Sequence, residues 1–166
     1  MSVMMKKIAA CLLMVVSLSA CSDIEDGPYD TEPANVSAQR LLDLVNDVRT
    51  SGCDCGNEYY PPVNPVSWNI QLENAAGGHS AFMEQTGDLS HTGSGGSDAG
   101  DRLLAEGYDW YAYGENIAEG YTTEDEVIAA WLNSEGHCEN IMSPEFEEMG
   151  VGVSGRYWTQ VFASPR

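Results

Sequence analysis

Residues 149–164 read MGVGVSGRYWTQVFAS, and apolar residues alternate with polar or small ones on both sides of the central Ser-Gly pair. Alternation with a period of two is the pattern of a strand with one buried face. Two such runs separated by a glycine-containing turn predict an antiparallel hairpin. The chain before this hairpin carries helical patterns and no regular exchange of strand and helix. We therefore expect an α+β domain with helices packed on a small antiparallel sheet.

Helical patterns precede the hairpin. Apolar residues recur at intervals of three and four through residues 36–50 and again through 72–83, where they place His79 on the apolar face. The small residues AAGG at 75–78 would let another element approach that helix closely. Thr123 and Glu126 predict a capping box for a later helix, which we expect Gly136 to terminate. TSGCDCG at 50–56 has the composition of a loop.

The first twenty residues have the composition of an export signal. Lys6 and Lys7 precede an apolar run over residues 8–18, which is too short to span a bilayer. The signal ends in LSAC at 18–21, which resembles the bacterial lipobox, so we expect Cys21 to be lipidated; cleavage near Ala20 without lipidation is the alternative. Residues 21–34 are acidic and contain proline, as expected of a flexible tether, and residues 35–166 form the folded domain.

The charge excludes some partners. The chain carries 26 acidic and 7 basic residues, a formal net charge of −19, and removal of the signal makes it more negative. Nucleic acid is not expected as a partner, because binding phosphates requires clustered Lys and Arg. An acidic surface also disfavours attraction to anionic lipids, so membrane contact should come through the lipid on Cys21. The sequence thus predicts an exported protein of the bacterial cell envelope, and specifically an outer-membrane lipoprotein.

Three cysteines fall in the predicted domain: Cys53, Cys55 and Cys138. In an oxidising compartment, this odd number predicts one disulfide and one remaining thiol. A bridge between Cys53 and Cys55 is disfavoured because a single intervening residue strains its geometry. We expect Cys138 to pair with one of the two, with Cys55 favoured. A bridge is also a more probable fate for Cys138 than a nucleophilic pair with the adjacent His137.

The chain has only three histidines, His79, His91 and His137. A single histidine on an apolar helix face is usually a hydrogen-bonded core residue, which applies to His79. His91 and His137 lie in stretches rich in Gly and Ser, where side chains are free to face a cleft. Glu115 lies among aromatic residues and could serve as an acid or base, could join imidazoles in a metal site, or could only bridge a loop.

Five segments, in order, resemble the CAP superfamily of cysteine-rich secretory proteins, antigen 5 and plant pathogenesis-related 1 proteins, and its bacterial SCP-like branch in particular. The segments are LSHTG (89–93), GENIAEG (114–120), AAWLNSEGHCENIM (129–142), MGVGV (149–153) and YWTQVFA (157–163). The resemblance implies a three-layer α-β-α sandwich with a central cleft. In many eukaryotic members two histidines and two glutamates line that cleft.

The resemblance implies a family position for each of several site residues. His91 matches the first cleft histidine, and Glu115 the glutamate of the GEN motif, with Asn116 beside it. Tyr157 stands where the second cleft histidine would be, so His137, with Asn140 nearby, is expected to supply the missing imidazole. His79 matches the HS..M helix of the bacterial branch, which implies that it faces the same cleft. His91, His137 and Glu115 could then hold a divalent metal such as zinc.

Three functions remain open from the sequence. The first is a non-enzymatic module that binds a small apolar ligand, a glycan or a partner protein, which the resemblance supports because sterol and lipid binding are better attested in the family than catalysis. The second is a hydrolase of peptide or cell-wall material, with Glu115 as general base and an imidazole or metal polarising the bond. The third is a structural role, in which the polar side chains form a buried network that fixes the fold.

Overall fold

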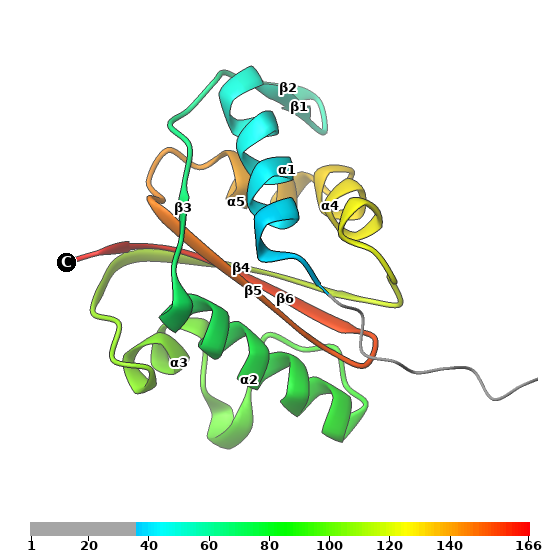
Figure 1. Ribbon diagram of the computed structural model, residues 1–166, viewed down its shortest axis with the longest axis vertical. Helices are drawn as coiled ribbons and strands as arrows, with labels where there is room; N and C mark the ends of the chain where they lie inside the picture. Colours follow the sequence, from blue (N-terminus) through cyan, green and yellow to red (C-terminus); the bar gives the residue numbers. More distant parts are fainter. Residues whose placement is uncertain (1–35) are drawn as a thin grey trace, which may run out of the picture. The chain divides into compact units, whose positions relative to one another are not determined.

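The computed structural model describes residues 36–166; the predicted signal, tether and lipidated Cys21 lie outside the described residues. The described residues form an α+β fold with five α-helices around a four-stranded sheet (Figure 1). Helices α1 (Ala38–Ser51), α4 (Glu124–Leu132) and α5 (Glu135–Met142) cover one face, and α2 (Ile70–Thr86) and α3 (Ala99–Ala105) cover the other. This is the predicted three-layer sandwich. Within residues 36–166, no helix is both long and apolar enough to cross a bilayer.

The sheet has the strand order β3-β5-β6-β4. Strands β5 (Glu148–Ser154) and β6 (Tyr157–Pro165) form the predicted antiparallel hairpin, whose two-residue turn is Gly155–Arg156, one position later than the Ser-Gly pair suggested. The two-residue strand β3 (Ser67–Trp68) pairs with β5 in parallel. The sheet is therefore mixed, whereas the sequence predicted only antiparallel pairs. The difference arises because β3 enters the sheet from a loop and not from a hairpin.

Strand β4 (Trp110–Glu119) carries the GEN motif and pairs antiparallel with β6, so that Glu115 lies opposite Val161 and Asn116 opposite Gln160. The sequence pattern did not predict this strand. Gly114 and the buried polar Asn116 interrupt the alternation that marks a strand with one exposed face. Helices cover both faces of the sheet, so the polar Asn116 and the apolar Ile117 and Ala118 are all buried.

Helix α2 packs on β5 with almost no side chain between the two backbones. A Cβ atom on Gly150 would lie 2.2 Å from the backbone nitrogen of Glu73, and one on Gly152 would lie 2.1 Å from that of Gly77. Both separations are far below van der Waals contact, so only glycine fits at these two positions of β5. The expectation that the small residues at 75–78 permit a close approach is confirmed at Gly77.

Two local predictions were wrong. Gly136 does not terminate a helix: α4 ends at Leu132, and Gly136 lies in the first turn of α5, because the chain is extended at Ser134 and a new helix begins there. His137 is therefore on a helix and not in a turn. The TSGCDCG stretch is likewise not all loop. Strands β1 (Cys53–Cys55) and β2 (Glu58–Tyr60) form a small hairpin around a Gly56-Asn57 turn, a pair of residues typical of such turns.

A buried arginine fixes the end of α5. Arg49 of α1 is fully buried and donates hydrogen bonds of 2.7–3.2 Å to the carbonyl oxygens of Asn64, Ile141, Ser143 and Phe146. Burial lowers the pKa of this guanidinium to about 10. Because these carbonyls come from the loop before β3 and from the end of α5, Arg49 ties both segments to α1.

Candidate functional site

Glu115, on β4, is the centre of a cluster of charged side chains between the sheet and the loop that precedes α3. Its side chain is only 5% exposed. One carboxylate oxygen, Oε1, accepts a 2.8 Å hydrogen bond from His91 Nδ1. The other, Oε2, accepts a hydrogen bond from Arg102 Nη2. Both carboxylate oxygens are therefore engaged by cationic or polar donors of the same chain.

Arg102 is a site residue that the sequence analysis missed. It lies on α3, its side chain is 12% exposed, and its Nη1 also donates to the carbonyl oxygens of Ser97 at 3.0 Å and His91 at 3.3 Å. Helix α3 begins with a complete capping box between Asp98 and Asp101, which fixes the first turn that carries Arg102. One guanidinium thus ties the 91–97 loop to Glu115 and compensates its charge.

His79 lies behind this cluster, on the sheet-facing side of α2, and is 1% exposed. Its Nε2 donates a 2.8 Å hydrogen bond to the carbonyl oxygen of Ser90 and is 3.9 Å from Glu115 Oε1. Within residues 36–166, its Nδ1 has no hydrogen-bond partner. Burial, only partly opposed by Glu115, lowers the pKa of this imidazole. His79 is a neutral, hydrogen-bonded core residue next to the cluster.

His91 differs from His79 because its side chain is 59% exposed. The hydrogen bond to Glu115 raises the pKa of this imidazole, with burial acting in the opposite direction. The cluster therefore has an exposed member, His91, that gains a proton easily, and a buried member, His79, that does not. Both were expected to face the cleft, and the structure places both beside Glu115.

A second, uncharged network holds α5 against the sheet. Asn116 is fully buried and donates hydrogen bonds to the carbonyl oxygen of His137 at 3.1 Å and to Gln160 Oε1 at 2.9 Å. Asn140 Nδ2 donates to Asn116 Oδ1 at 2.9 Å and to the Glu115 carbonyl oxygen at 3.2 Å. Gln160, the glutamine of the YWTQ segment, was not predicted as a site residue. The network fixes the position of His137 relative to β4.

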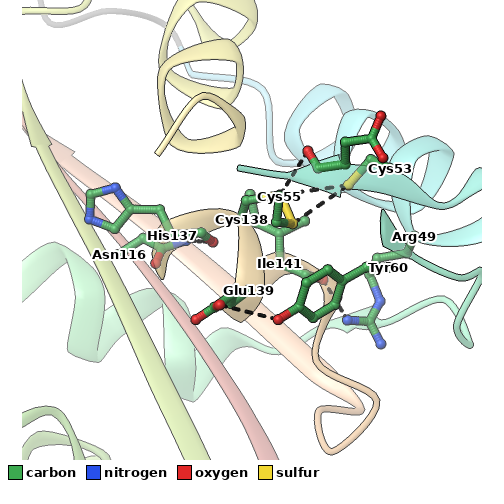
Figure 2. The surroundings of a disulfide bond; sticks show 10 residues. Arg49, Cys53, Cys55, Tyr60, Asn116, His137, Cys138, Glu139 and Ile141 are labelled. Carbon is green, nitrogen blue, oxygen red and sulfur yellow. Dashed lines mark hydrogen bonds between the residues drawn. A yellow bond between two sulfur atoms is a disulfide. The ribbon is translucent and has the colours of Figure 1, made fainter. Parts of the chain in front are cut away.

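His137 and Cys138 are adjacent in α5, but their side chains point in opposite directions (Figure 2). Cys138 points to the small hairpin and forms a disulfide with Cys55, while the imidazole of His137 points the other way. Burial, followed by the charge of His91, lowers the pKa of His137. A nucleophile–base pair between these neighbours is therefore excluded by geometry.

His137 lines a pocket of about 360 Å³. Leu89 and Ile117 line it, and each is two residues from a member of the charged cluster. Ala118 of β4 and Ala130 and Trp131 of α4 add further apolar groups; the full set is Leu89, Ile117, Ala118, Glu119, Tyr121, Ala130, Trp131, Ser134 and His137. A larger pocket of about 830 Å³ lies at the edge of β5 near Trp68 and contains no histidine.

Tyr157, predicted as a cleft residue, is buried next to Ile117 of the pocket wall. It is 7% exposed and packs in a small hydrophobic cluster with Met83 and Ile117. Its ring therefore serves the core between α2 and the sheet.

The predicted metal ligands do not converge. Among residues 36–166, the only three His, Cys, Asp or Glu residues whose ligand atoms all lie within 4.8 Å of one another are the three cysteines. His91, His137 and Glu115 do not meet that distance as a set. In addition, the guanidinium of Arg102 holds one oxygen of Glu115, and a second cation next to it would be repelled. The donor set as folded does not fit a divalent metal.

Comparisons with known proteins agree with the fold. Residues 42–162 match the Cysteine-rich secretory protein family, CAP. The chain is 33% identical over 134 residues to the uncharacterized protein YkwD of Bacillus subtilis, an alignment that covers 78% of this chain and 49% of that relative. The chain thus spans about half the length of this curated relative.

Solved structures show the same fold. An extracellular protein of Bacillus anthracis that contains an SCP domain superposes with a TM-score of 0.66 at 32% identity, over 75% of this chain and 39% of that one. An outer surface protein of Borrelia burgdorferi superposes with a TM-score of 0.64 at 18% identity, over 77% of this chain and 92% of that one.

Proposed function

Because the chain belongs to the cysteine-rich secretory protein (CAP) family, we propose that it is a non-enzymatic binding module of the cell envelope, whose pocket beside His137 takes a small molecule with an apolar body. The observation that carries this proposal is the engagement of both Glu115 oxygens by His91 and Arg102. A carboxylate that is only 5% exposed and has both oxygens held by donors of its own chain is poorly placed to reach a substrate proton. The hydrolase alternative loses its proposed base.

The pocket supports binding of an apolar group. Trp131 and Ile117 give it apolar walls, and Glu119, Ser134 and His137 add polar groups. His137 is mostly uncharged near neutral pH, because burial lowers its pKa. Apolar walls with a few oriented polar groups are the usual composition of small-molecule sites. At about 360 Å³ the pocket accommodates a small ligand or one acyl chain segment.

A tryptophan at position 130 is expected to block binding. The probe is a dansyl-labelled fatty acid, followed by energy transfer from tryptophan, because Trp131 lines the pocket. Ala130→Trp fills the pocket and should weaken binding at least tenfold. Ala81→Trp, at an exposed position of α2 outside the pocket, is the matched control and should bind as the wild type does.

A third variant tests the location. Asn74→Trp fills the larger pocket near Trp68 instead. If Asn74→Trp abolishes binding and Ala130→Trp does not, the ligand site is the pocket at the β5 edge and the proposal for His137 is wrong. Absence of saturable probe binding to the wild type would remove the apolar-ligand proposal altogether.

Membrane attachment through Cys21 is the second part of the proposal. The relatives described as extracellular and outer surface proteins support export, and the LSAC segment supports lipidation of Cys21 as an outer-membrane lipoprotein. Cys21→Ser is expected to move the protein from the membrane fraction to the soluble fraction and to abolish incorporation of a labelled fatty acid. Cys53→Ser is the control, with unchanged fractionation. Unchanged membrane association of Cys21→Ser would contradict the anchor.

The alternative function is a structural role for the polar cluster, and the hydrogen bonds of Arg102 and Asn116 favour it. Arg102 and Asn116 link the 91–97 loop, β4 and α5 through hydrogen bonds that reach four different segments of the chain. Such a network stabilises the walls of the pocket whether or not it touches a ligand. The two roles are separated by the stability of a Glu115 variant, argued in the Discussion.

A further inference from the structure

Three sulfur atoms meet between the small hairpin and α5. Cys53 and Cys55 are two residues apart on strand β1, so both side chains point to the same face. Cys138, on α5, faces them and is joined to Cys55 by a disulfide (Figure 2). The Sγ atom of Cys53 is 3.6 Å from that of Cys138 and 3.9 Å from that of Cys55.

We propose that these three cysteines form a disulfide-exchange site, in which Cys138 alternates between a bond to Cys55 and a bond to Cys53. Two features of the arrangement make both pairings accessible. Strand β1 presents Cys53 and Cys55 on the same face, towards Cys138, and the sulfur of Cys53 lies beside the existing Cys55–Cys138 bond. A shift of the bond from one to the other requires no change in the pairing of β1 with β2.

The exchange is balanced without an external oxidant or reductant. The Cys53 thiol loses its proton, and the thiolate attacks Cys138 Sγ. The Cys53–Cys138 bond forms, the Cys55–Cys138 bond breaks, and the Cys55 thiolate leaves and takes up a proton. Because the two distances from Cys53 Sγ are nearly equal, this sulfur lies beside the bond, and a rotation of the Cys53 side chain must bring it into line. Cys53 is only half-buried, which leaves room for that rotation.

Exchange changes which thiol is accessible. Cys55 and Cys138 are fully buried, whereas Cys53 is half-buried. With Cys138 bonded to Cys55 the odd thiol can be reached by other molecules, and with Cys138 bonded to Cys53 it is enclosed. Burial, followed by the charge of Asp54, raises the pKa of the Cys53 thiol. The thiol is therefore mostly protonated at neutral pH, which keeps the exchange slow.

The same sulfurs are close enough to one another to be considered as metal ligands. A sulfur in a disulfide is not a thiolate, however, and thiolates are the form in which cysteine binds metals. With the Cys55–Cys138 bond formed, the site has a single thiol, so exchange is the chemistry that the arrangement supports.

Mapping the odd thiol tests the proposal. The full-length protein is incubated at about pH 8.5, then trapped with N-ethylmaleimide in denaturant at about pH 5, where exchange is slow. Cleavage at Asp54 followed by mass spectrometry separates Cys53 from Cys55. We expect label on both residues of the wild type. In Cys55→Ala we expect a Cys53–Cys138 bond and no label on either, and Cys53→Ala, the control, should keep the Cys55–Cys138 bond.

Two results would overturn the exchange. One is label confined to Cys53 in the wild type, which means that the odd thiol never leaves that position. The other is a folded Cys55→Ala protein with label on both Cys53 and Cys138. If Cys55→Ala fails to fold, the position of the label in the wild type decides alone.

Discussion

Cys138→Ala is expected to lower the free energy of unfolding by about 4 kcal/mol and the melting temperature by roughly 12–20 °C. The Cys55–Cys138 bond joins residues 83 apart in the sequence, and in the chain-entropy account a loop of this length gives a disulfide about 4 to 5 kcal/mol of stabilisation. The bond also links the β1–β2 hairpin to α5, the helix that carries His137. Thermal unfolding followed by circular dichroism, without reductant, measures the effect.

Two comparisons make the result specific to the bond. Cys53→Ala removes a half-buried thiol outside the disulfide and should melt within about 2 °C of the wild type. A dithiol reductant should destabilise the wild type as much as the Cys138 substitution does, and should leave the Cys138→Ala protein unchanged. A Cys138→Ala protein that melts like Cys53→Ala would show that the bond contributes little to stability.

The overall architecture could be predicted because its signals are local. The hairpin at 149–164 shows its alternation within sixteen residues, and α1 and α2 show their apolar faces within four turns each. The glycines of β5 and the small residues of α2 were visible separately in the sequence. That Gly152 meets Gly77 could not be seen, because a contact between two backbones leaves no periodic pattern.

Arg102 escaped prediction for a related reason. It lies in a short helix whose sequence shows no partner, and the carboxylate it binds is on β4, a strand that itself gave no alternating pattern. The prediction for Gly136 was wrong for a different reason, because a local signal was present but was overridden. Glycine usually ends helices, but here Ser134 starts a new helix two residues earlier, and Arg49 and Asn116 hold that helix in place through its backbone carbonyls.

A family resemblance predicted His91 and Glu115 as site residues, and the structure adds the hydrogen bond between them. A sequence motif gives residue types at positions, but not the charge that surrounds them. Here a carboxylate that the sequence left open as a base or a metal ligand is paired with a guanidinium. The functional interpretation therefore depends on how much of the fold's stability this pair supplies.

Glu115→Gln is expected to lower the free energy of unfolding by about 3 to 5 kcal/mol, because it leaves Arg102 nearly buried without a counter-charge. The matched control is Glu119→Gln on the same strand. Glu119 pairs with Arg156 at 3.2 Å, but that arginine side chain is 67% exposed. Exposed pairs contribute less than about 1 kcal/mol, so the control should unfold nearly as the wild type does. Chemical denaturation of both variants measures the difference.

The pH dependence provides a second readout. Glu115 raises the pKa of His91 in the folded state, so the stabilisation from this histidine is fully present below its unfolded pKa of about 6.5 and is lost as the pH rises through its folded pKa. Glu115→Gln removes this contribution, so the gap in stability between wild type and variant should be larger at about pH 5.5 than at about pH 8. His79 titrates in the opposite sense, since its pKa is lowered mainly by burial, with Glu115 acting against that shift.

The size of the loss decides between the remaining functions. In one outcome, Glu115→Gln loses several kcal/mol of unfolding free energy while its folded fraction still binds the dansyl fatty acid. That result would show that Glu115 stabilises the walls of the pocket and takes no part in a reaction. A loss no greater than that of Glu119→Gln would mean that the ion pair is dispensable for folding. In that case Glu115 does not support the fold through Arg102, and the structural alternative would be wrong.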